Sequence, residues 1–255
     1  MFLRTLLCAV PLMMTAIPPP AVAEDLKVLA AGAIAPVVRT VAADFERRSG
    51  IHVEVHNATG GVTERRIRSG ERFDLTVVPS NLLQSLAADH YVDERSAREL
   101  AQVGIGVAVK AGAPHPVIAT VAQFKAALLA APSVAVIDPK AGGSSGIYLE
   151  KLFEKMGIAK QMHAKEVLVP GGLVAEKLLD GSAALALHQQ SEILAVKGAQ
   201  LVGPLPAALQ NYTVYVAALS PRSNAQGMAR AFLTMFSQEH AQMAMREHGL
   251  TPNND

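Results

Sequence analysis

The sequence has 255 residues, of which 50% are hydrophobic, and its formal net charge at pH 7 is +1. A chain of this length can bury a large core, either as one domain or as two lobes. A net charge near zero argues against a nucleic-acid partner, which would require a basic face. The single cysteine, Cys8, lies near the start of the chain, so the remainder has no thiol for a disulfide, a metal site or a nucleophile.

The first 23 residues have the pattern of a secretory signal. Arg4 precedes an apolar stretch at 6–17, and the small-x-small motif Ala21-Val22-Ala23 stands before Glu24. This stretch is shorter than the roughly 20 residues that a membrane-spanning helix needs, and no other segment is long and apolar enough. We therefore expect cleavage after Ala23 and export to the periplasm.

Hydrophobic periodicity after residue 24 predicts strands that alternate with helices. Strands are expected at 26–31, 51–55, 73–78, 103–110, 133–137, 165–169, 184–188 and 212–219. Helices are expected at 35–49, 62–69, 82–88, 121–129, 146–156, 173–179, 226–237 and 241–247. This order predicts an α/β fold of two lobes, each a mixed, mostly parallel sheet flanked by helices.

A two-lobed chain without a low-complexity linker has to cross between its lobes in ordered segments. The segments 103–109 and 212–218 are apolar and long enough to serve as hinges. We therefore expect residues 24–104 and 212–255 to form lobe 1, and residues 105–211 to form lobe 2. A single continuous sheet is the alternative that periodicity leaves open.

Four turns that contain glycine each follow a predicted strand and precede a predicted helix, at 31–33, 58–61, 142–146 and 170–172. Such turns present free backbone N–H groups at the positive end of a helix. In an open α/β sheet they lie beyond the carboxyl ends of the strands, where ligands bind, so together they predict one anion site. Ordinary turn and cap chemistry is the alternative for any single turn. The expected ligand-binding residues of these turns are Gly32, Ala33, Thr59, Gly60, Ser144, Ser145 and Gly171.

Several stretches of the sequence resemble a known family. They are LKVLAAGAIAPVVRTVAADFERRSGIHVEV with ATGGVTERRIRSGERFDLTVV, and VGIGVAVKAG with VAVIDPKAGGSSGIYLEKLFEKMGI. They resemble the molybdate-binding proteins of the type 2 periplasmic solute-binding family, along the length of the chain that follows the signal. The resemblance implies a protein that captures a small anion between two lobes for an ABC transporter, with no cofactor and no metal. We expect a monomer.

The family's ligand residues map onto this sequence with two losses. Its first ligand serine falls at Ala33, its second at Thr59, and its ligand tyrosine at or near His188. Only Thr59 keeps an aliphatic hydroxyl, which puts molybdate in doubt. His188 instead suits a carboxylate, because histidine can donate a hydrogen bond and carry charge near neutral pH. The sequence leaves open molybdate, tungstate or an organic polycarboxylate.

One branch that looks similar to this chain contains aconitate isomerase, an enzyme on the same scaffold. Moving the double bond between cis- and trans-aconitate needs a base for a proton beside a carboxylate, and donors that hold the developing negative charge. His188 is the candidate base, and the glycine turns are candidate donors. Because binding alone would use the same parts, anion capture for uptake is the first hypothesis and isomerisation the alternative.

The run 142–146 also matches the G-x-S-x-G pattern of a serine hydrolase, and Ser144, Asp180 and His188 occur in a permitted order. A nucleophile elbow places the serine directly after its strand, whereas residues 138–141 intervene here. Asp180 and His188 are also close in sequence for two members of a triad. We therefore regard a hydrolase as the weaker hypothesis.

Two charged patterns have both a functional and a structural interpretation. His52, Glu54 and His56 would share one face of a strand, which fits either a metal site or a solvated face, and we favour the solvated face. Arg65 or Arg66 would reach a polycarboxylate at the rim of a cleft, since guanidinium groups bind carboxylates in two-pronged fashion. A solvated helix face is the favoured interpretation of this basic run as well.

Overall fold

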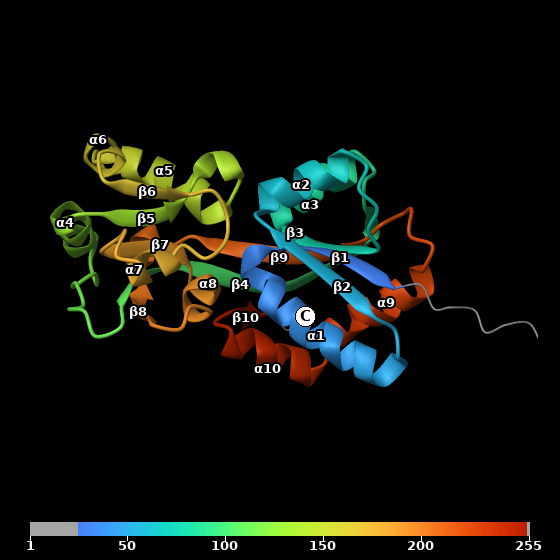
Figure 1. Cartoon of the computed structure of the whole chain (residues 1–255). Helices are drawn as coiled ribbons and strands as arrows, with labels where there is room; N and C mark the ends of the chain where they lie inside the picture. Colours follow the sequence, from blue (N-terminus) through green and yellow to red (C-terminus); the bar gives the residue numbers. More distant parts are fainter. Residues whose placement is uncertain (1–24, 254–255) are drawn as a thin grey trace, which may run out of the picture.

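The computed structural model of the protein describes residues 25–253 and has two lobes joined side by side (Figure 1). The expected signal and its cleavage after Ala23 lie outside the described residues. Within residues 25–253, no helix combines the length and the apolar character that crossing a membrane requires.

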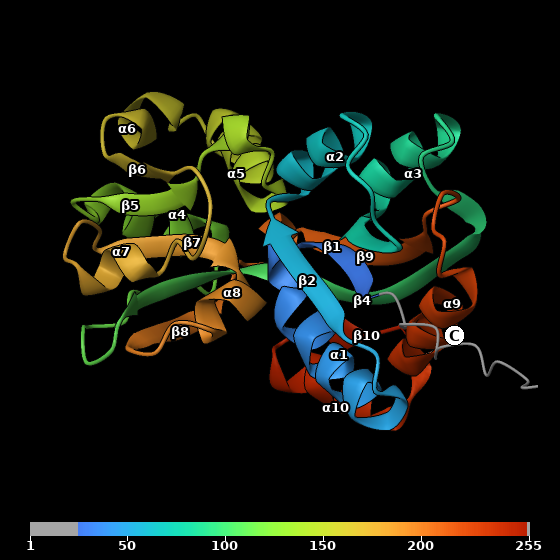
Figure 2. The same ribbon diagram turned by 45° about the vertical axis from the view of Figure 1, so that its right-hand side comes forward.

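The first lobe is built on a sheet with the strand order β2-β1-β3-β9-β4. Strand β1 is parallel to β2 and β3, whereas β9 is antiparallel to both β3 and β4. Helices α1, α9 and α10 bury one face of this sheet, and α2 and α3 bury the other (Figure 2). The bounds are β1 Leu26–Ala31, β2 Val53–Ala58, β3 Leu75–Pro79, β4 Asp93–Lys110, β9 Tyr212–Leu219, β10 Thr251–Pro252, α1 Ala35–Ser49, α2 Gly60–Arg68, α3 Ser80–Ala88, α9 Gln226–Thr234 and α10 Glu239–Glu247.

The second lobe uses the other end of β4, which pairs with β7 and β8 in antiparallel fashion. Strands β7, β5 and β6 continue this sheet in parallel. Helices α4, α5 and α6 pack on one face, and α7 and α8 pack on the other. The bounds are β5 Val134–Ile137, β6 Glu166–Val169, β7 Leu185–Gln189, β8 Ala199–Pro204, α4 Val121–Ala130, α5 Ser144–Lys155, α6 Ala159–His163, α7 Glu176–Leu179 and α8 Gln190–Leu194. The two-lobed α/β class expected from the sequence is confirmed.

Strand β4 belongs to both sheets, and the change of partner falls within two residues. Gly104 pairs with Tyr212 of the first lobe, and Ile105 pairs with Gln189 of the second. The side chain of Gln210 completes this crossing, because its Oε1 accepts from Ile105 N and its Nε2 donates to Ile105 O, both at 2.9 Å.

The return crossing differs from the expected one. Strand β9 pairs only within the first lobe's sheet, so the chain returns through residues 205–211 and not along 212–218. The assignment of residues 24–104 and 212–255 to one lobe and 105–211 to the other stays a prediction.

Helix α1 illustrates how local sequence determines an element. Pro36 occupies its first turn, where a missing N–H costs nothing. A buried face, which includes Val37, Val41 and Phe45, packs on the sheet. Gly50 ends the helix in the left-handed region at φ 72°, a conformation that glycine adopts without steric strain.

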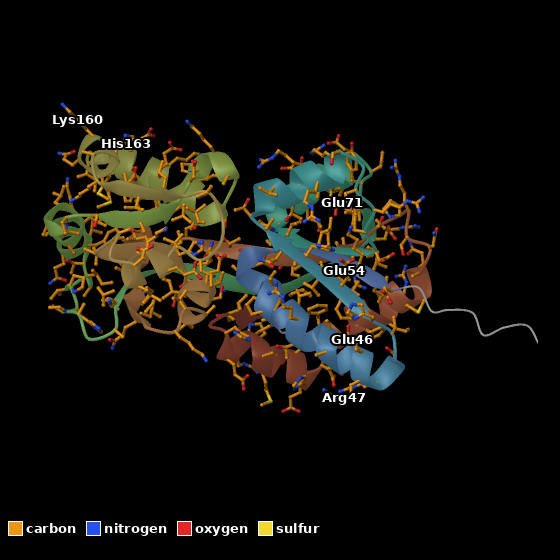
Figure 3. All side chains as sticks on the ribbon, viewed as in Figure 1. Glu46, Arg47, Glu54, Glu71, Lys160 and His163 are labelled. Atoms are coloured by element: carbon orange, nitrogen blue, oxygen red, sulfur yellow. The ribbon has the colours of Figure 1, made fainter. Side chains whose placement is uncertain are left out.

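Charged side chains project from the outer surfaces of both lobes, as Arg47 and Lys160 do (Figure 3). Asp44 is an exception, since it is 3% exposed. Its carboxylate contacts both Arg47 and Arg48 one turn further along α1. A buried carboxylate that is paired in this way avoids the large cost of an isolated charge.

Candidate functional site between the lobes

A cavity of about 510 Å³ lies between the two lobes. Residues from both lobes line it, including every site residue expected from the sequence: Gly32, Ala33, Thr59, Gly60, Ser144, Ser145, Gly171 and His188. Parallel strands explain this convergence, because the turns that follow β1 and β2, or β5 and β6, lie at the same edge of their sheet. The roles of these residues in ligand binding stay predictions.

Two helices begin at the cavity, one from each lobe. Helix α2 begins at Gly60, and its N-cap residue Thr59 accepts a hydrogen bond from Val62 N. Helix α5 begins at Ser144, with Gly143 as an N-cap that has no side chain to offer. The positive end of each helix dipole therefore borders the same space, which favours a negatively charged ligand.

The two serines of α5 occupy different surroundings. Ser144 Oγ accepts from Gln189 Nε2 at 2.9 Å and from Thr213 Oγ1 at 3.3 Å, which ties α5 to β7 and β9. Ser145 is 1% exposed. Gln189 is 1% exposed as well, and its Oε1 is a buried acceptor without a protein partner. Both serines line the cavity, and Ser144 is the one held in a polar network.

The most unusual pair in the cavity is His188 at the end of β7 and Glu192 in α8. His188 Nε2 lies 3.1 Å from Glu192 Oε2, and the two side chains are 3% and 13% exposed. Glu192 also touches the opposite lobe, since a Cβ placed on Gly32 would stand 2.5 Å from Glu192 Oε1. The pair therefore lies where the two lobes meet.

Burial shifts both members of this pair toward their uncharged forms. It lowers the pKa of His188 to about 3 and raises the pKa of Glu192 to about 8. Near pH 7 the imidazole is thus neutral and the carboxyl group keeps its proton. A protonated carboxyl group can donate a hydrogen bond to an anion, whereas an ionised one would repel it.

Tyr215 and Arg39 complete the polar lining, and sequence reasoning missed both. Burial, followed by the charge of Glu192, raises the pKa of Tyr215, so its phenol keeps its proton. Arg39 is exposed and donates to Asn57 Oδ1 at the rim. Arg39 lies on the polar face of α1, where nothing in the periodicity separates it from a solvated arginine. Glu192 was missed as well, although its spacing of four residues from His188 could have indicated that the two side chains meet.

The three residues considered for a serine hydrolase do not come together as a catalytic triad. Ser144 and His188 both line the cavity, but Asp180 is exposed at the end of α7, where it accepts from Lys177 Nζ and Ser182 N. The carboxyl group beside His188 belongs to Glu192. Ser144, Asp180 and His188 therefore do not form one catalytic unit.

The two histidines considered as metal ligands contact one carboxylate each, in separate pairs. His52 contacts Glu46 at 2.6 Å and His56 contacts Glu54 at 2.7 Å. Across residues 25–253, no three His, Cys, Asp or Glu side chains are grouped so that they could hold a metal ion. The solvated-face interpretation of β2 fits these pairs.

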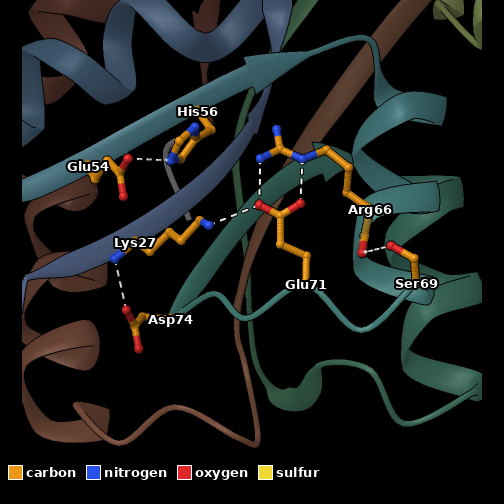
Figure 4. Close-up of polar contacts among 7 residues, drawn as sticks. All are labelled: Lys27, Glu54, His56, Arg66, Ser69, Glu71 and Asp74. Carbon is orange, nitrogen blue, oxygen red and sulfur yellow. Dashed lines mark hydrogen bonds and ion pairs between the residues drawn. The ribbon is translucent and has the colours of Figure 1, made fainter.

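Arg65 and Arg66 are not among the residues that line the cavity, which fits the favoured interpretation of this run as a solvated helix face and not the alternative of a ligand contact at the rim. Arg66 forms a two-pronged contact with Glu71, at 2.6 and 2.5 Å, and Lys27 Nζ lies 2.9 Å from the same carboxylate (Figure 4). The hydrogen bond from Arg66 is the main cause that lowers the pKa of Glu71 to about 2. Arg39 takes the rim position instead.

Comparison with known proteins agrees with this architecture. The family model of bacterial extracellular solute-binding proteins matches residues 26–251. A curated relative, aconitate isomerase from a Pseudomonas species, is 33% identical over 233 residues, which cover 89% of this chain and 87% of the relative.

Solved structures show the same fold at low sequence identity. The periplasmic molybdate-binding protein of Azotobacter vinelandii has a TM-score of 0.75 at 15% identity, over 89% of this chain and 99% of that chain. The sulfate-binding protein of Mycobacterium tuberculosis H37Rv has a TM-score of 0.72 at 17% identity, over 89% of this chain and 86% of that chain. The family match spans nearly all of the described residues, and the chain belongs to the bacterial extracellular solute-binding protein family.

Proposed function

We propose that this protein is a periplasmic binding protein that captures a small carboxylate anion between its lobes and presents it to an ABC transporter. One observation carries this proposal: the positive ends of α2 and α5, from opposite lobes, border one cavity. Backbone N–H groups at helix N-termini are suited to anionic oxygens. Closure of the lobes would surround the ligand from both sides.

A carboxylate fits the side chains better than a tetrahedral oxyanion does. Ala33 supplies no hydroxyl, and Thr59 Oγ1 already donates to Ala141 O. Arg39 at the rim offers a planar fork that matches the two oxygens of a carboxylate. Neutral His188 and Glu192 leave the interior without a buried negative charge near pH 7.

A thermal-shift screen tests the proposal directly. The ligands are molybdate, tungstate, sulfate, phosphate, and small di- and tricarboxylates such as tricarballylate and trans-aconitate. A ligand at 100 times its Kd stabilises the native state by about 2.7 kcal/mol, so a carboxylate should raise the melting temperature clearly. Arg39→Gln should weaken that shift, and Arg65→Gln, a matched change outside the cavity, should preserve it. Stabilisation by molybdate or tungstate alone would refute the carboxylate proposal.

The geometry of His188 and Glu192 favours a second candidate function, isomerisation of aconitate. A neutral imidazole can take a proton from the methylene carbon, and a protonated carboxyl group can give one to the vinyl carbon, which shifts the double bond. Transfer of the proton from the imidazolium to the carboxylate, across the 3.1 Å between Nε2 and Oε2, would then restore both groups. The relative named aconitate isomerase supports this candidate over nearly the whole chain. Donors from the helix N-termini would hold the charge that develops on the substrate carboxylates.

Turnover separates the two candidates. Proton NMR of cis-aconitate with catalytic amounts of protein would show trans-aconitate if the protein is an enzyme. His188→Gln should then lower the rate by at least about 100-fold, the usual contribution of a positioned acid or base, while carboxylate binding persists. Binding by the wild type without any interconversion would leave passive capture as the function.

A further inference from the structure

The two lobes touch directly beside the cavity through a pair of glycines. Gly61 N, in the first turn of α2, donates to Gly142 O at 3.0 Å, in the turn before α5. A Cβ on Gly61 would stand 2.8 Å from Gly142 Cα, and a Cβ on Gly142 would stand 2.7 Å from Gly61 Cα. Only residues without a side chain allow the two backbones to approach this closely.

The hydroxyl group of Thr59 makes a second contact across the same gap. Thr59 Oγ1 donates to Ala141 O at 2.5 Å and accepts from Val62 N at 3.2 Å. A threonine hydroxyl has a single proton, so this proton is committed to the opposite lobe and not to a ligand. The contact gives Thr59 a role different from that of an oxyanion donor.

We infer that Thr59, Gly61 and Gly142 form a latch that stabilises the closed arrangement of the lobes, and that Thr59 positions the lobes instead of donating to the ligand. Both hydrogen bonds join protein to protein, so they favour closure whether or not a ligand is bound. A contact that exists in only one of two states shifts the equilibrium toward that state. The effect of the latch on ligand affinity rests on the proposed carboxylate binding, but its effect on closure does not.

The latch predicts a measurable change in the closed-to-open ratio. A hydrogen bond of ordinary net strength shifts such a ratio by about three- to tenfold. Thr59→Val removes the hydroxyl proton at nearly constant volume, and Thr59→Ser keeps it. Gly61→Ala places a methyl group against Gly142 Cα and should open the lobes more strongly. Apparent ligand affinity falls with the closed fraction.

Distances between spin labels on the two lobes test the latch without any ligand. Cysteines at Asn81 in α3 and Lys151 in α5, both exposed, carry the labels in a Cys8→Ser background. We expect Thr59→Val and Gly61→Ala to move the distance distribution toward longer values, and Thr59→Ser to match the parent. Thr120→Val is the matched control, because Thr120 caps α4 as Thr59 caps α2 but lies away from the cavity.

Each outcome has a distinct meaning. If the Thr59→Val distribution equals that of the parent protein while tricarballylate binds more weakly, Thr59 is a ligand donor and the latch is refuted. If Thr120→Val lengthens the distances as much as Thr59→Val does, cap loss explains the change and the latch is refuted. Failure of the wild type to bind any carboxylate would refute the proposed function and leave the ligand-free distances as the test of the latch.

Discussion

At the scale of single residues, burial shifts the pKa values of two neighbouring groups in opposite directions. Removal from water disfavours the charged form of both His188 and Glu192, so the basic group loses affinity for protons and the acidic group gains it. Their total charge is zero in either protonation pattern. The neutral pattern leaves a hydrogen-bond donor and an acceptor 3.1 Å apart at the wall of the cavity.

This pair makes stability depend on pH in a defined way. Against ordinary values of 6.5 for histidine and 4.5 for glutamate, the native state binds fewer protons at His188 and more at Glu192. Stability therefore rises with pH between about 3 and 4.5, where only His188 contributes. Between 4.5 and 6.5 the contributions of His188 and Glu192 to the pH dependence have opposite signs and cancel. Between 6.5 and about 8 only Glu192 contributes, and stability falls as pH rises, by at most about 1.4 kcal/mol per pH unit.

Glu192→Gln should abolish the decrease in stability between pH 6.5 and about 8, because glutamine does not titrate. Urea unfolding at half-unit pH steps measures the effect. Glu154→Gln, an exposed change on α5, serves as the control and should retain the decrease. An unchanged pH profile in Glu192→Gln would show that the carboxyl group titrates normally in the native state.

The sequence identified candidate residues where local chemistry was distinctive and missed them where it was not. Glycine turns after strands led to Gly32, Gly60 and Gly171, all of which line the cavity. Arg39 and Tyr215 could not be separated from a surface arginine and a core tyrosine, because their place depends on how the lobes meet. Thr59 was located at the cavity edge, but its partner on the opposite lobe lies 82 positions away in the sequence.

At the scale of elements, strand β4 shows where periodicity stops being informative. The expected strand covered only 103–110, whereas β4 begins at Asp93. Its first part contains exposed charged residues that show no alternation, and pairing with β9 imposes the extended conformation there. β8 and α8 were missed because five or six residues carry too little periodicity to be recognised.

The Gln210 side chain stabilises the point where β4 passes from one lobe to the other. Gln210→Ala removes the acceptor for Ile105 N and a donor to Ile105 O. Ile105 is 0% exposed. An unsatisfied buried backbone group costs about 1–3 kcal/mol, so we expect a loss of that size in unfolding free energy. Gln84→Ala, exposed on α3, should have little effect in the same urea titration. Equal stabilities would show that water replaces the amide group.

At the scale of the whole molecule, each lobe has a core on both faces of its sheet. The largest cluster joins α1, α9 and α10, and Phe232 lies at its centre with edge-to-face contacts to Phe45 and Phe236, both at 5.4 Å between ring centroids. The βαβα order was sufficient to predict this α/β class. The individual contacts between the lobes could not be predicted, because they join turns that lie far apart in the sequence.

Phe232→Ala should lower the free energy of unfolding by about 3–5 kcal/mol, since it removes a fully buried ring from a packed cluster. Guanidinium titration measures the loss, and Met243→Ala, which is exposed on α10, is the control. Tricarballylate binding should persist in the folded fraction of Phe232→Ala, because the ring lies away from the cavity. A loss below about 1 kcal/mol would mean that the cluster collapses around the vacancy.

The position of β9 has a consequence for how the chain is made. This strand lies between β3 and β4, yet it is synthesised more than a hundred residues after either of them, and α9 and α10, which close the largest core, follow it. Until residue 212 leaves the ribosome, β3 has no neighbour on that side, and α1 lacks the cover that α9 and α10 supply. The sheet and the largest core of the first lobe can therefore be completed only after the last segment of the chain has been synthesised.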